Sequence, residues 1–179
     1  LKTRIIAAQT RADTTIRDVC EQDAALSLLY AAAVETLIEK ANVPASKIEA
    51  IGNHGQTLLH APEADHPFTL QIGDNHRLAE LLGITVVGDF RRRDIAAGGQ
   101  GAPLVPAFHR SLVSQTETAA FLNVGGIANV SIIAPDRVSG FDTGPGNTLS
   151  DTWISKHQQQ AFDAGGAWAR TGTVNEPLL

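Results

Sequence analysis

The sequence has a single cysteine, Cys20, which excludes an internal disulfide and a metal site built from cysteines. Aromatic residues make up only 5% and charged residues 18% of the chain, whereas hydrophobic residues reach 43%. A packed core is therefore available, and a disordered chain is disfavoured. No apolar run reaches membrane-spanning length, and the start shows no signal-peptide pattern. The formal net charge of −5 gives no overall electrostatic case for binding nucleic acid.

The chain of 179 residues is long enough for one domain or for parts of two. Strands alternate with helices in the first part, and near residues 111–118 the pattern restarts with a strand hairpin followed by a helix. We therefore expect two parts, residues 1–113 and 114–179. The sequence begins with Leu1 and ends with Pro177-Leu178-Leu179, so we expect both ends to be cuts through a longer protein.

Hydrophobic spacing predicts the alternating helices and strands of an α/β protein. The strongest pattern is a helix over residues 23–41, whose apolar side chains recur at helical spacing and form a stripe. The stripe consists of Leu26, Leu29, Ala33 and Leu37, widened by Leu28 and Val34. A weaker helix begins near Thr14. Further helices are expected at 76–82, 104–112 and 148–163, and strands at 48–52, 68–73, 84–87, 118–122, 130–133 and 138–141. Asp74-Asn75 should cap the helix at 76–82, which should end at Gly83.

A glycine-rich stretch, residues 140–147, lies between the last expected strand and the last expected helix. Asp142 lies where that strand should end, and Gly144 and Gly146 let the backbone bend sharply behind it. Asn147 is placed to cap the helix. A carboxylate at a strand end beside a helix N-terminus is well placed to meet a ligand. The alternative is a structural turn in which Asp142 bonds its own backbone.

A second candidate site follows the strand expected at residues 48–52, in the loop from Asn53 to Thr57. His54 and Gln56 offer neutral hydrogen-bonding groups, and the glycine between them allows close approach to the backbone. His54 and His60 could also suggest a metal. No cysteine or carboxylate completes a familiar ligand spacing, however, so no metal site is expected.

Three arginines, residues 91–93, stand between Asp89 and Asp94 after an expected buried strand. Arginine can hold a carboxylate through two parallel hydrogen bonds, which suits the recognition of an anionic substrate. The alternatives are a salt-bridged surface loop or a phosphate-backbone contact, and the absence of interleaved aromatic residues disfavours nucleic acid. The glycine-rich residues 98–101 predict a loop that lets the backbone approach a ligand.

The segment from Asn123 to Asn129 joins two expected strands through a double glycine. Its backbone amides could face a phosphate, as glycine turns often do. A plain hairpin is the alternative.

Taken together, these stretches resemble the anhydro-N-acetylmuramic acid kinases of bacterial cell-wall recycling. The matching segments are GNHGQT at 52–57, QIG at 71–73, DFRRRD at 89–94 with GGQGAPLVP at 98–106, NVGGIAN at 123–129 and FDTGPGN at 141–147. They occur in the family's order, and the ordered set is specific although single pieces are not.

The resemblance implies an α/β fold of the actin/sugar-kinase/Hsp70-like (ribonuclease H-like) class, with two lobes around a cleft. It also implies a cytoplasmic enzyme that uses ATP and Mg²⁺ to open the 1,6-anhydro ring of anhydro-N-acetylmuramic acid. The same enzyme phosphorylates O6, giving N-acetylmuramic acid 6-phosphate. The family often forms homodimers, so a homodimer is the implied assembly.

The resemblance also assigns roles to individual residues. Asp142 would be the general base that takes a proton from the water attacking the anomeric carbon. The substrate-binding residues would be His54, Gln56, Thr57, Arg91, Arg92, Arg93 and Asp94. We favour Arg92 for the lactyl carboxylate, but the sequence does not choose among the three arginines. The residues facing ATP would be Asn123, Gly125, Gly126, Gly144 and Gly146. No residue is expected to ligate a metal directly, because Mg²⁺ would arrive with ATP.

The family's glycine/threonine phosphate loop would lie before Leu1, and its adenosine-binding half would lie after Leu179. We therefore expect these 179 residues alone not to turn over substrate. Two other classes stay open. One is a carbohydrate- or nucleotide-binding module without chemistry, which would not need Asp142. The other is a metal-dependent hydrolase built on His54, His60 and the aspartates.

Overall fold

The computed structural model describes residues 1–11 and 13–178, which form two compact units, Leu1–Ala102 and Pro103–Leu179. The functional division at residues 113 and 114 stays a prediction.

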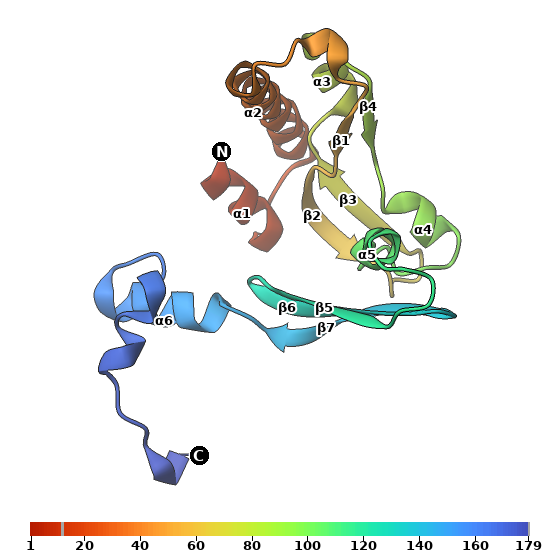
Figure 1. The fold of residues 1–179 in the computed structure, drawn as a ribbon. Helices are drawn as coiled ribbons and strands as arrows, with labels where there is room; N and C mark the ends of the chain where they lie inside the picture. The colour runs from red at the N-terminus through yellow and green to blue at the C-terminus, as the bar shows by residue number, and fades with distance from the viewer. Residues whose placement is uncertain (12, 179) are drawn as a thin grey trace. The chain divides into compact units, whose positions relative to one another are not determined.

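The first unit contains two successive helices, then short strands and further helices (Figure 1). Its elements are α1 (Lys2–Thr10), α2 (Ile16–Ala41), a 3₁₀ turn (Ala45–Lys47), β1 (Ile51–Asn53), β2 (Gln56–Ala61), β3 (Phe68–Ile72), α3 (Asn75–Leu82), β4 (Val86–Gly88) and α4 (Arg92–Ala96). Strands β1 and β4 pair in parallel, and β2 and β3 form an antiparallel hairpin. Helix α2 packs against α3 and β3.

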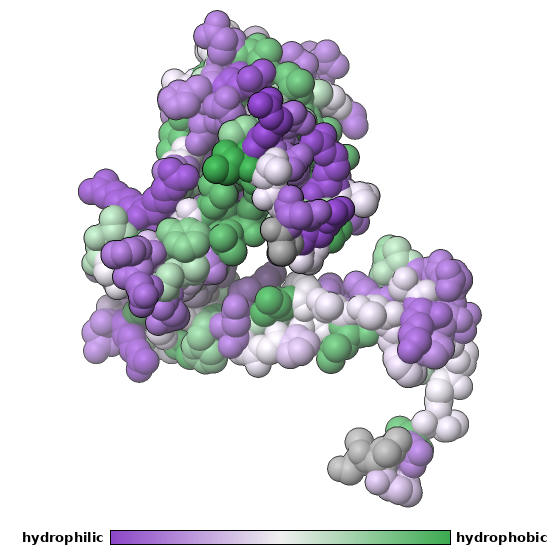
Figure 2. Space-filling view, turned by 180° about the vertical axis from the view of Figure 1, so that it is seen from behind, coloured by the Kyte–Doolittle hydropathy of each residue, from purple (hydrophilic) through white to green (hydrophobic). Residues whose placement is uncertain are grey.

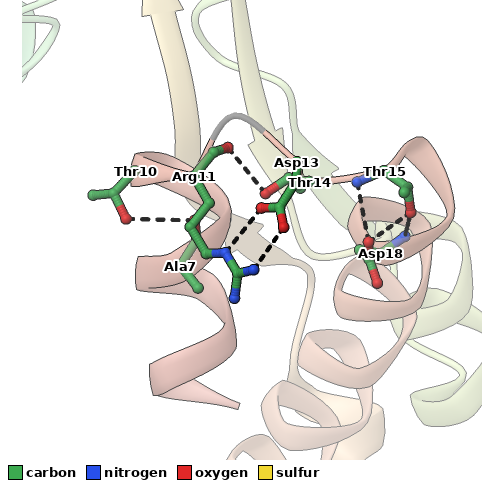
Figure 3. Close-up of polar contacts among 7 residues, drawn as sticks. All are labelled: Ala7, Thr10, Arg11, Asp13, Thr14, Thr15 and Asp18. Atoms are coloured by element: carbon green, nitrogen blue, oxygen red, sulfur yellow. Dashed lines mark hydrogen bonds and ion pairs between the residues drawn. The ribbon is translucent and has the colours of Figure 1, made fainter.

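Helix α2 is longer than either helix expected in its region, because the weak helix near Thr14 and the strong one at 23–41 are continuous. A capping box begins it: the Thr15 hydroxyl accepts from the Asp18 backbone N–H, and Asp18 accepts from the Thr15 backbone N–H (Figure 3). The helix ends at Asn42, whose φ of +52° is left-handed.

The core of the first unit is a cluster of Leu26, Leu58 and Ile72 between α2 and the hairpin. The predicted stripe on α2 is only partly buried, since Leu26 is 5% exposed whereas Leu29 and Leu37 are 56% and 65% exposed. Hydrophobic residues also reach the surface between hydrophilic ones on the face seen in Figure 2. The partners of α2 thus cover a narrower strip of the helix than its apolar stripe provides.

The second unit is built around an antiparallel sheet, β5-β6-β7, with helices at both sequence ends (Figure 1). Its elements are α5 (Val105–Ser111), β5 (Ala119–Val124), β6 (Ile127–Ala134), β7 (Arg137–Pro145), α6 (Thr148–Gln158) and three 3₁₀ turns, Ala164–Gly166, Ala169–Thr171 and Glu176–Leu178. The predicted hairpin with a double-glycine turn is confirmed, because Gly125 and Gly126 alone separate β5 from β6.

Helix α5 is held to this sheet by a buried polar contact. The Nδ1 atom of His109 lies 2.9 Å from the hydroxyl oxygen of Ser131, which is buried on β6. The His109 ring also stacks on Phe121 of β5, with ring centroids 4.2 Å apart. The core of the unit further contains Ile133 and Ile154, which are both almost fully buried.

Several expected elements are corrected. Helix α1 and strand β2 had not been predicted, and α4 occupies part of the arginine segment that was expected to be a loop. The strand expected at 84–87 begins later, at Val86, and Val87 on it is half exposed. Helix α6 stops at Gln158, where Gln159 takes up a left-handed conformation.

No helix in the described ranges combines the length and the hydropathy that crossing a membrane would require.

The capping box predicts an acid dependence of stability. Hydrogen bonds from the Thr15 hydroxyl and backbone N–H lower the pKa of the Asp18 carboxyl below its ordinary value of 3.8. A carboxyl with a lowered folded pKa stabilises the fold above its unfolded pKa, and this contribution is lost as the pH falls through the folded pKa. We expect Asp18→Asn to flatten the fall in unfolding temperature between about pH 5 and pH 2, measured by circular dichroism.

The control for this experiment is Asp136→Asn, which changes an exposed carboxylate in the β6–β7 turn. Its pH profile should follow that of the wild type. An Asp18→Asn profile parallel to the wild type would contradict the stabilising role of the capping box.

Candidate functional site: strand ends of the first unit and a bulged strand of the second

The parallel pair of β1 and β4 brings two chain segments together at its carboxyl edge. Asn53 at the end of β1 pairs with Gly88 at the end of β4. His54 and Asp89 are therefore the next residues beyond the two paired ends. Ligands of open α/β sheets characteristically bind outside the carboxyl ends of parallel strands.

A cavity of about 330 Å³ lies at this edge, which is within the range of small-molecule sites. His54, Asp89 and Arg92 line it together with residues from the start of α3 and the turn after β3. Another cavity, of about 290 Å³, lies at the α1–α2 turn, and none of the expected site residues lines it. A third cavity, of about 400 Å³ beside α4, is lined by Arg92 but by no other expected site residue. The strand-end cavity, which brings His54 and Arg92 together, is therefore the candidate site of the first unit.

The wall of this cavity is fixed by the side chain of Asn53, which is only 9% exposed. Its Nδ2 group donates to the Gly73 carbonyl at 2.9 Å and to Asn75 Oδ1 at 2.7 Å, and its Oδ1 accepts from the Gly55 N–H at 3.1 Å. One buried amide thus joins the end of β1, the turn after β3 and the start of α3.

Two carboxylates of the cavity hold the backbone in place. Asp23 on α2 accepts from the Gly73 N–H at 2.6 Å. Asp74 caps α3 by accepting from the backbone N–H groups of His76 and Arg77. The predicted cap of α3 at Asp74 is thereby confirmed.

Arg91 binds protein atoms on two sides. Its Nε donates to His54 Nε2 at 2.7 Å, and its Nη1 donates to the Gly101 carbonyl at 2.6 Å. His54 Nδ1 lies 2.8 Å from the Gly55 carbonyl, which can only accept, so Nδ1 carries the ring proton. In this arrangement His54 is the neutral imidazole.

Asp94 binds the end of the glycine-rich loop, residues 98–101. Its Oδ2 accepts from the Gly101 N–H at 2.7 Å, while Arg91 binds the carbonyl of the same residue. Arg91 and Asp94 thus hold both polar groups of Gly101, an arrangement we call the Gly101 clamp.

The hydrogen bonds distinguish the three arginines. Arg91 belongs to the Gly101 clamp. Arg92 lines the cavity and lies 3.6 Å from Asp89 Oδ1 in a half-exposed ion pair. Arg93 is exposed and makes no side-chain hydrogen bond or ion pair with any described residue. Of the three, Arg92 is the arginine that both lines the cavity and keeps most of its donors available.

Gln56 and Thr57 lie on β2, and neither lines this cavity. The Gln56 side chain donates to the Thr57 carbonyl, and the Thr57 hydroxyl accepts from Gln71 at 3.2 Å. Their role in substrate binding stays a prediction. Asn53 belonged to the predicted loop without a role of its own, and Asp23 and Asp89 had not been predicted as site residues. A glycine followed by an aspartate directly after an apolar strand was the signal that could have pointed to Asp89.

Asp142 lies inside a strand of the second unit, whereas the sequence had predicted a strand end. Strand β7 continues to Pro145 because its last residues still pair with β6. Asn129 pairs with Asp142 and Ala128 pairs with Gly144, so Thr143 is an extra residue in β7. This is a β-bulge, a feature that often re-aims side chains near functional sites. The Thr143 hydroxyl donates to the Ala128 carbonyl at 3.1 Å, which links the bulge to β6. Asp142, the residue before it, is exposed.

The residues expected to face ATP gather at the same end of this sheet. The Gly146 and Asn147 N–H groups donate to the carbonyls of Gly126 and Gly125, both at 2.8 Å. Gly146 has no room for a Cβ against the Gly125 carbonyl. Gly144 pairs with Ala128, and Asn123 pairs with Asn129 across the β5–β6 hairpin.

Asn147 occupies the N-cap position of α6, as predicted, but its side chain does not cap the helix. The Thr148 hydroxyl instead donates to the Gly126 carbonyl at 2.7 Å. This hydrogen bond joins the start of α6 to the double-glycine turn.

Across residues 1–11 and 13–178, no group of three or more His, Cys, Asp or Glu side chains is arranged to hold a metal ion. His60, considered above with His54, has its Nδ1 atom 3.0 Å from the Thr69 hydroxyl oxygen.

A family model for anhydro-N-acetylmuramic acid kinase matches residues 1–179. The chain belongs to this family. It is similar to the anhydro-N-acetylmuramic acid kinase of Coxiella burnetii (strain Dugway 5J108-111), with 51% identity over 183 residues, covering 100% of this chain and 49% of the relative. The Haemophilus influenzae kinase is 53% identical over 169 residues, covering 93% and 44% of the two chains. The corresponding Xylella fastidiosa (strain Temecula1) protein is 54% identical over 159 residues, covering 88% and 42%.

Membership of the kinase family confirms the resemblance carried by the ordered motifs and the fold class that it implied. That class is the α/β, actin/sugar-kinase/Hsp70-like fold. The chain spans about half the length of the curated relatives it matches.

The Gly101 clamp predicts a measurable protection of the glycine-rich loop. Asp94→Ala removes the acceptor of the Gly101 N–H, and a hydrogen bond to a charged group contributes about 1.5–3 kcal/mol. We expect the Gly101 amide to exchange with solvent at least about tenfold faster in this variant, measured by NMR hydrogen exchange.

Arg93→Ala, on the same short helix, is the matched control and should leave Gly101 protection unchanged. Equal protection of Gly101 in the wild type and in Asp94→Ala would show that the clamp does not hold the loop.

Proposed function

We propose that the full-length protein is an ATP-dependent kinase that hydrolyses the 1,6-anhydro ring of anhydro-N-acetylmuramic acid and phosphorylates O6. The observation that carries the proposal is the bulge in β7, which leaves the Asp142 carboxylate exposed beside the two joined glycine turns. The proposed base and the proposed phosphate-facing turns would thus act from one end of one sheet. The family membership is the second support.

In the proposed reaction, Asp142 accepts a proton from a water molecule that attacks the anomeric carbon. The bond from that carbon to O6 breaks, and O6 then attacks the γ-phosphorus of ATP. The products are N-acetylmuramic acid 6-phosphate and ADP. The rigid strand suits this role, because a general base must lie within hydrogen-bond reach of the attacking water.

Gly125, Gly126, Gly144 and Gly146 would face the phosphates of ATP, where backbone amides can meet negative charge. Mg²⁺, bound with ATP, would supply further charge neutralisation. We further propose a small amino sugar and ATP as the partners and the cytoplasm as the location. The homodimer stays a prediction.

Arg92 is the proposed partner of the lactyl carboxylate. It lines the strand-end cavity and, unlike Arg91, is not bound to a backbone carbonyl. His54, Arg91 and Asp94 would contribute to the sugar site chiefly by fixing the loops around Arg92.

Asp142→Asn should abolish turnover by the full-length protein while leaving sugar binding measurable. General-base catalysis contributes roughly 10²–10⁴-fold, so kcat should fall by at least about a hundredfold. A coupled ADP-release assay measures kcat, and calorimetric titration with the anhydro sugar measures binding.

The control is Asp136→Asn, an exposed aspartate at the other end of β7, which should keep wild-type kcat. Normal turnover by Asp142→Asn would refute its role as the base. Sugar binding without any turnover by the wild type would favour a binding module without chemistry.

Arg92→Gln should raise KM for the anhydro sugar by about ten- to a hundredfold, because a charge-assisted hydrogen bond contributes about 1.5–3 kcal/mol. The effect on kcat should be smaller, since the lactyl group does not react. Steady-state kinetics of the full-length protein measure both constants.

Arg93→Gln serves as the matched control and should keep the wild-type KM. A KM that Arg92→Gln leaves unchanged would count against the carboxylate contact.

A further inference from the structure

We propose that Asp89 is a second substrate-contacting residue, which accepts hydrogen bonds from a hydroxyl or the acetamido N–H of the amino sugar beside Arg92. The inference rests on the proposed function. It states which residue of the strand-end cavity would recognise the hydrogen-bond donors of the substrate. Three features of Asp89 support it: its left-handed backbone, its half-exposed carboxylate, which accepts no hydrogen bond from the described residues, and its ion pair with Arg92.

The backbone of Asp89 is in a conformation that favours glycine. Its φ is +56°, and only three non-glycine residues of the described chain have a positive φ. The left-handed region is unfavourable for residues with a Cβ, although aspartate and asparagine enter it more readily than most. Such conformations cluster at ligand sites when the surroundings enforce them.

The strand end that leads into Asp89 is held in place by two buried or partly buried amides. The preceding Gly88 has no room for a Cβ, because the Asn75 side chain occupies that space. Asn75 is itself held by Asn53 Nδ2 at 2.7 Å. The buried amide pair therefore fixes the strand end from which Asp89 enters the cavity.

Asp89 also differs from the other two carboxylates of the cavity. Asp23 and Asp74 each accept backbone N–H groups, as described above. The Asp89 side chain is 49% exposed, and its one polar contact among the described residues is the 3.6 Å ion pair with Arg92. An unfavourable backbone conformation is thus combined with a carboxylate that caps no helix or turn.

The neighbouring charges match a ligand that carries both an acid and hydrogen-bond donors. A carboxylate accepts from O–H and N–H groups, and a guanidinium donates to a carboxylate. An acidic amino sugar offers all of these groups. A ligand with only a carboxylate would meet repulsion from Asp89, and a neutral sugar would give the free donors of Arg92 no carboxylate to bind, so the pair favours the acidic amino sugar.

Asp89→Gly in the full-length protein tests the inference, because glycine keeps the left-handed backbone and removes only the carboxylate. We expect KM for the anhydro sugar to rise by about ten- to a hundredfold, and calorimetric Kd to rise in parallel. The unfolding temperature should not fall by more than about 2 °C, since glycine relieves the conformational cost.

Asn42→Gly is the matched control. Asn42 has a similar φ of +52° at the end of α2 and does not line the cavity. It should show the same small change in unfolding temperature with unchanged KM and Kd.

A probe lacking the lactyl ether, 1,6-anhydro-N-acetylglucosamine, separates direct contact from an effect through Arg92. Asp89→Gly should weaken binding of this probe, whereas Arg92→Gln should not. If Asp89→Gly binds the probe as tightly as the wild type, Asp89 acts only by placing Arg92, and the inference is overturned.

The outcomes distinguish this inference from the proposed function. A wild-type protein that turns over the sugar while Asp89→Gly keeps its KM and Kd overturns only the role of Asp89. A wild-type protein that binds the sugar without turnover overturns the kinase function, and the Kd of Asp89→Gly still decides the contact. A wild-type protein that binds neither sugar overturns both.

Discussion

The candidate sugar site depends on one buried side chain, the amide of Asn53. Its three hydrogen bonds join the end of β1 to the turn after β3 and to Asn75 at the start of α3. Asn75 in turn fills the space beside Gly88, so the same amide pair fixes the end of β4. A buried amide left without partners would be costly, and a fully bonded one holds its segments in a single arrangement. The loops that carry His54, Asp89 and the arginines all begin from this fixed edge.

In the second unit, the register between β6 and β7 fixes the position of Asp142. The bulge at Thr143 shifts β7 against β6 by one residue, and the following backbone bonds join Gly146 and Asn147 to the double-glycine turn. Asp142 is therefore placed by a sheet and not by a free loop. This suits a base that must meet one water molecule, because a strand holds a side chain more closely than a mobile loop does.

The sequence predicted those features that depend on local chemistry. The β5–β6 hairpin followed from its double glycine, and α3 followed from Asp74 before it and Gly83 after it. The inward face of α2 could not be predicted in full, because its packing partners decide which apolar residues are covered. The ordered motifs identified the family, yet they could not separate Arg91 from Arg92. That distinction depends on the hydrogen bonds that Arg91 donates to His54 and Gly101. His54 is far from Arg91 in the sequence, and Gly101 lies at the other end of a loop. Asp89 could not be predicted as a site residue for a similar reason. Its positive φ, and the Asn75 side chain that fills the space beside Gly88, are visible only in the structure.

In the proposed reaction, a water molecule opens the anhydro ring at the anomeric carbon, and the released O6 takes the phosphate. The most direct test is turnover by the full-length protein in ¹⁸O-labelled water, followed by rapid quenching and mass spectrometry of the product. We predict one ¹⁸O atom in the anomeric hydroxyl and none in the bond between O6 and phosphorus. Label in the phosphate ester, or a ring-opened sugar formed without phosphate, would contradict the account.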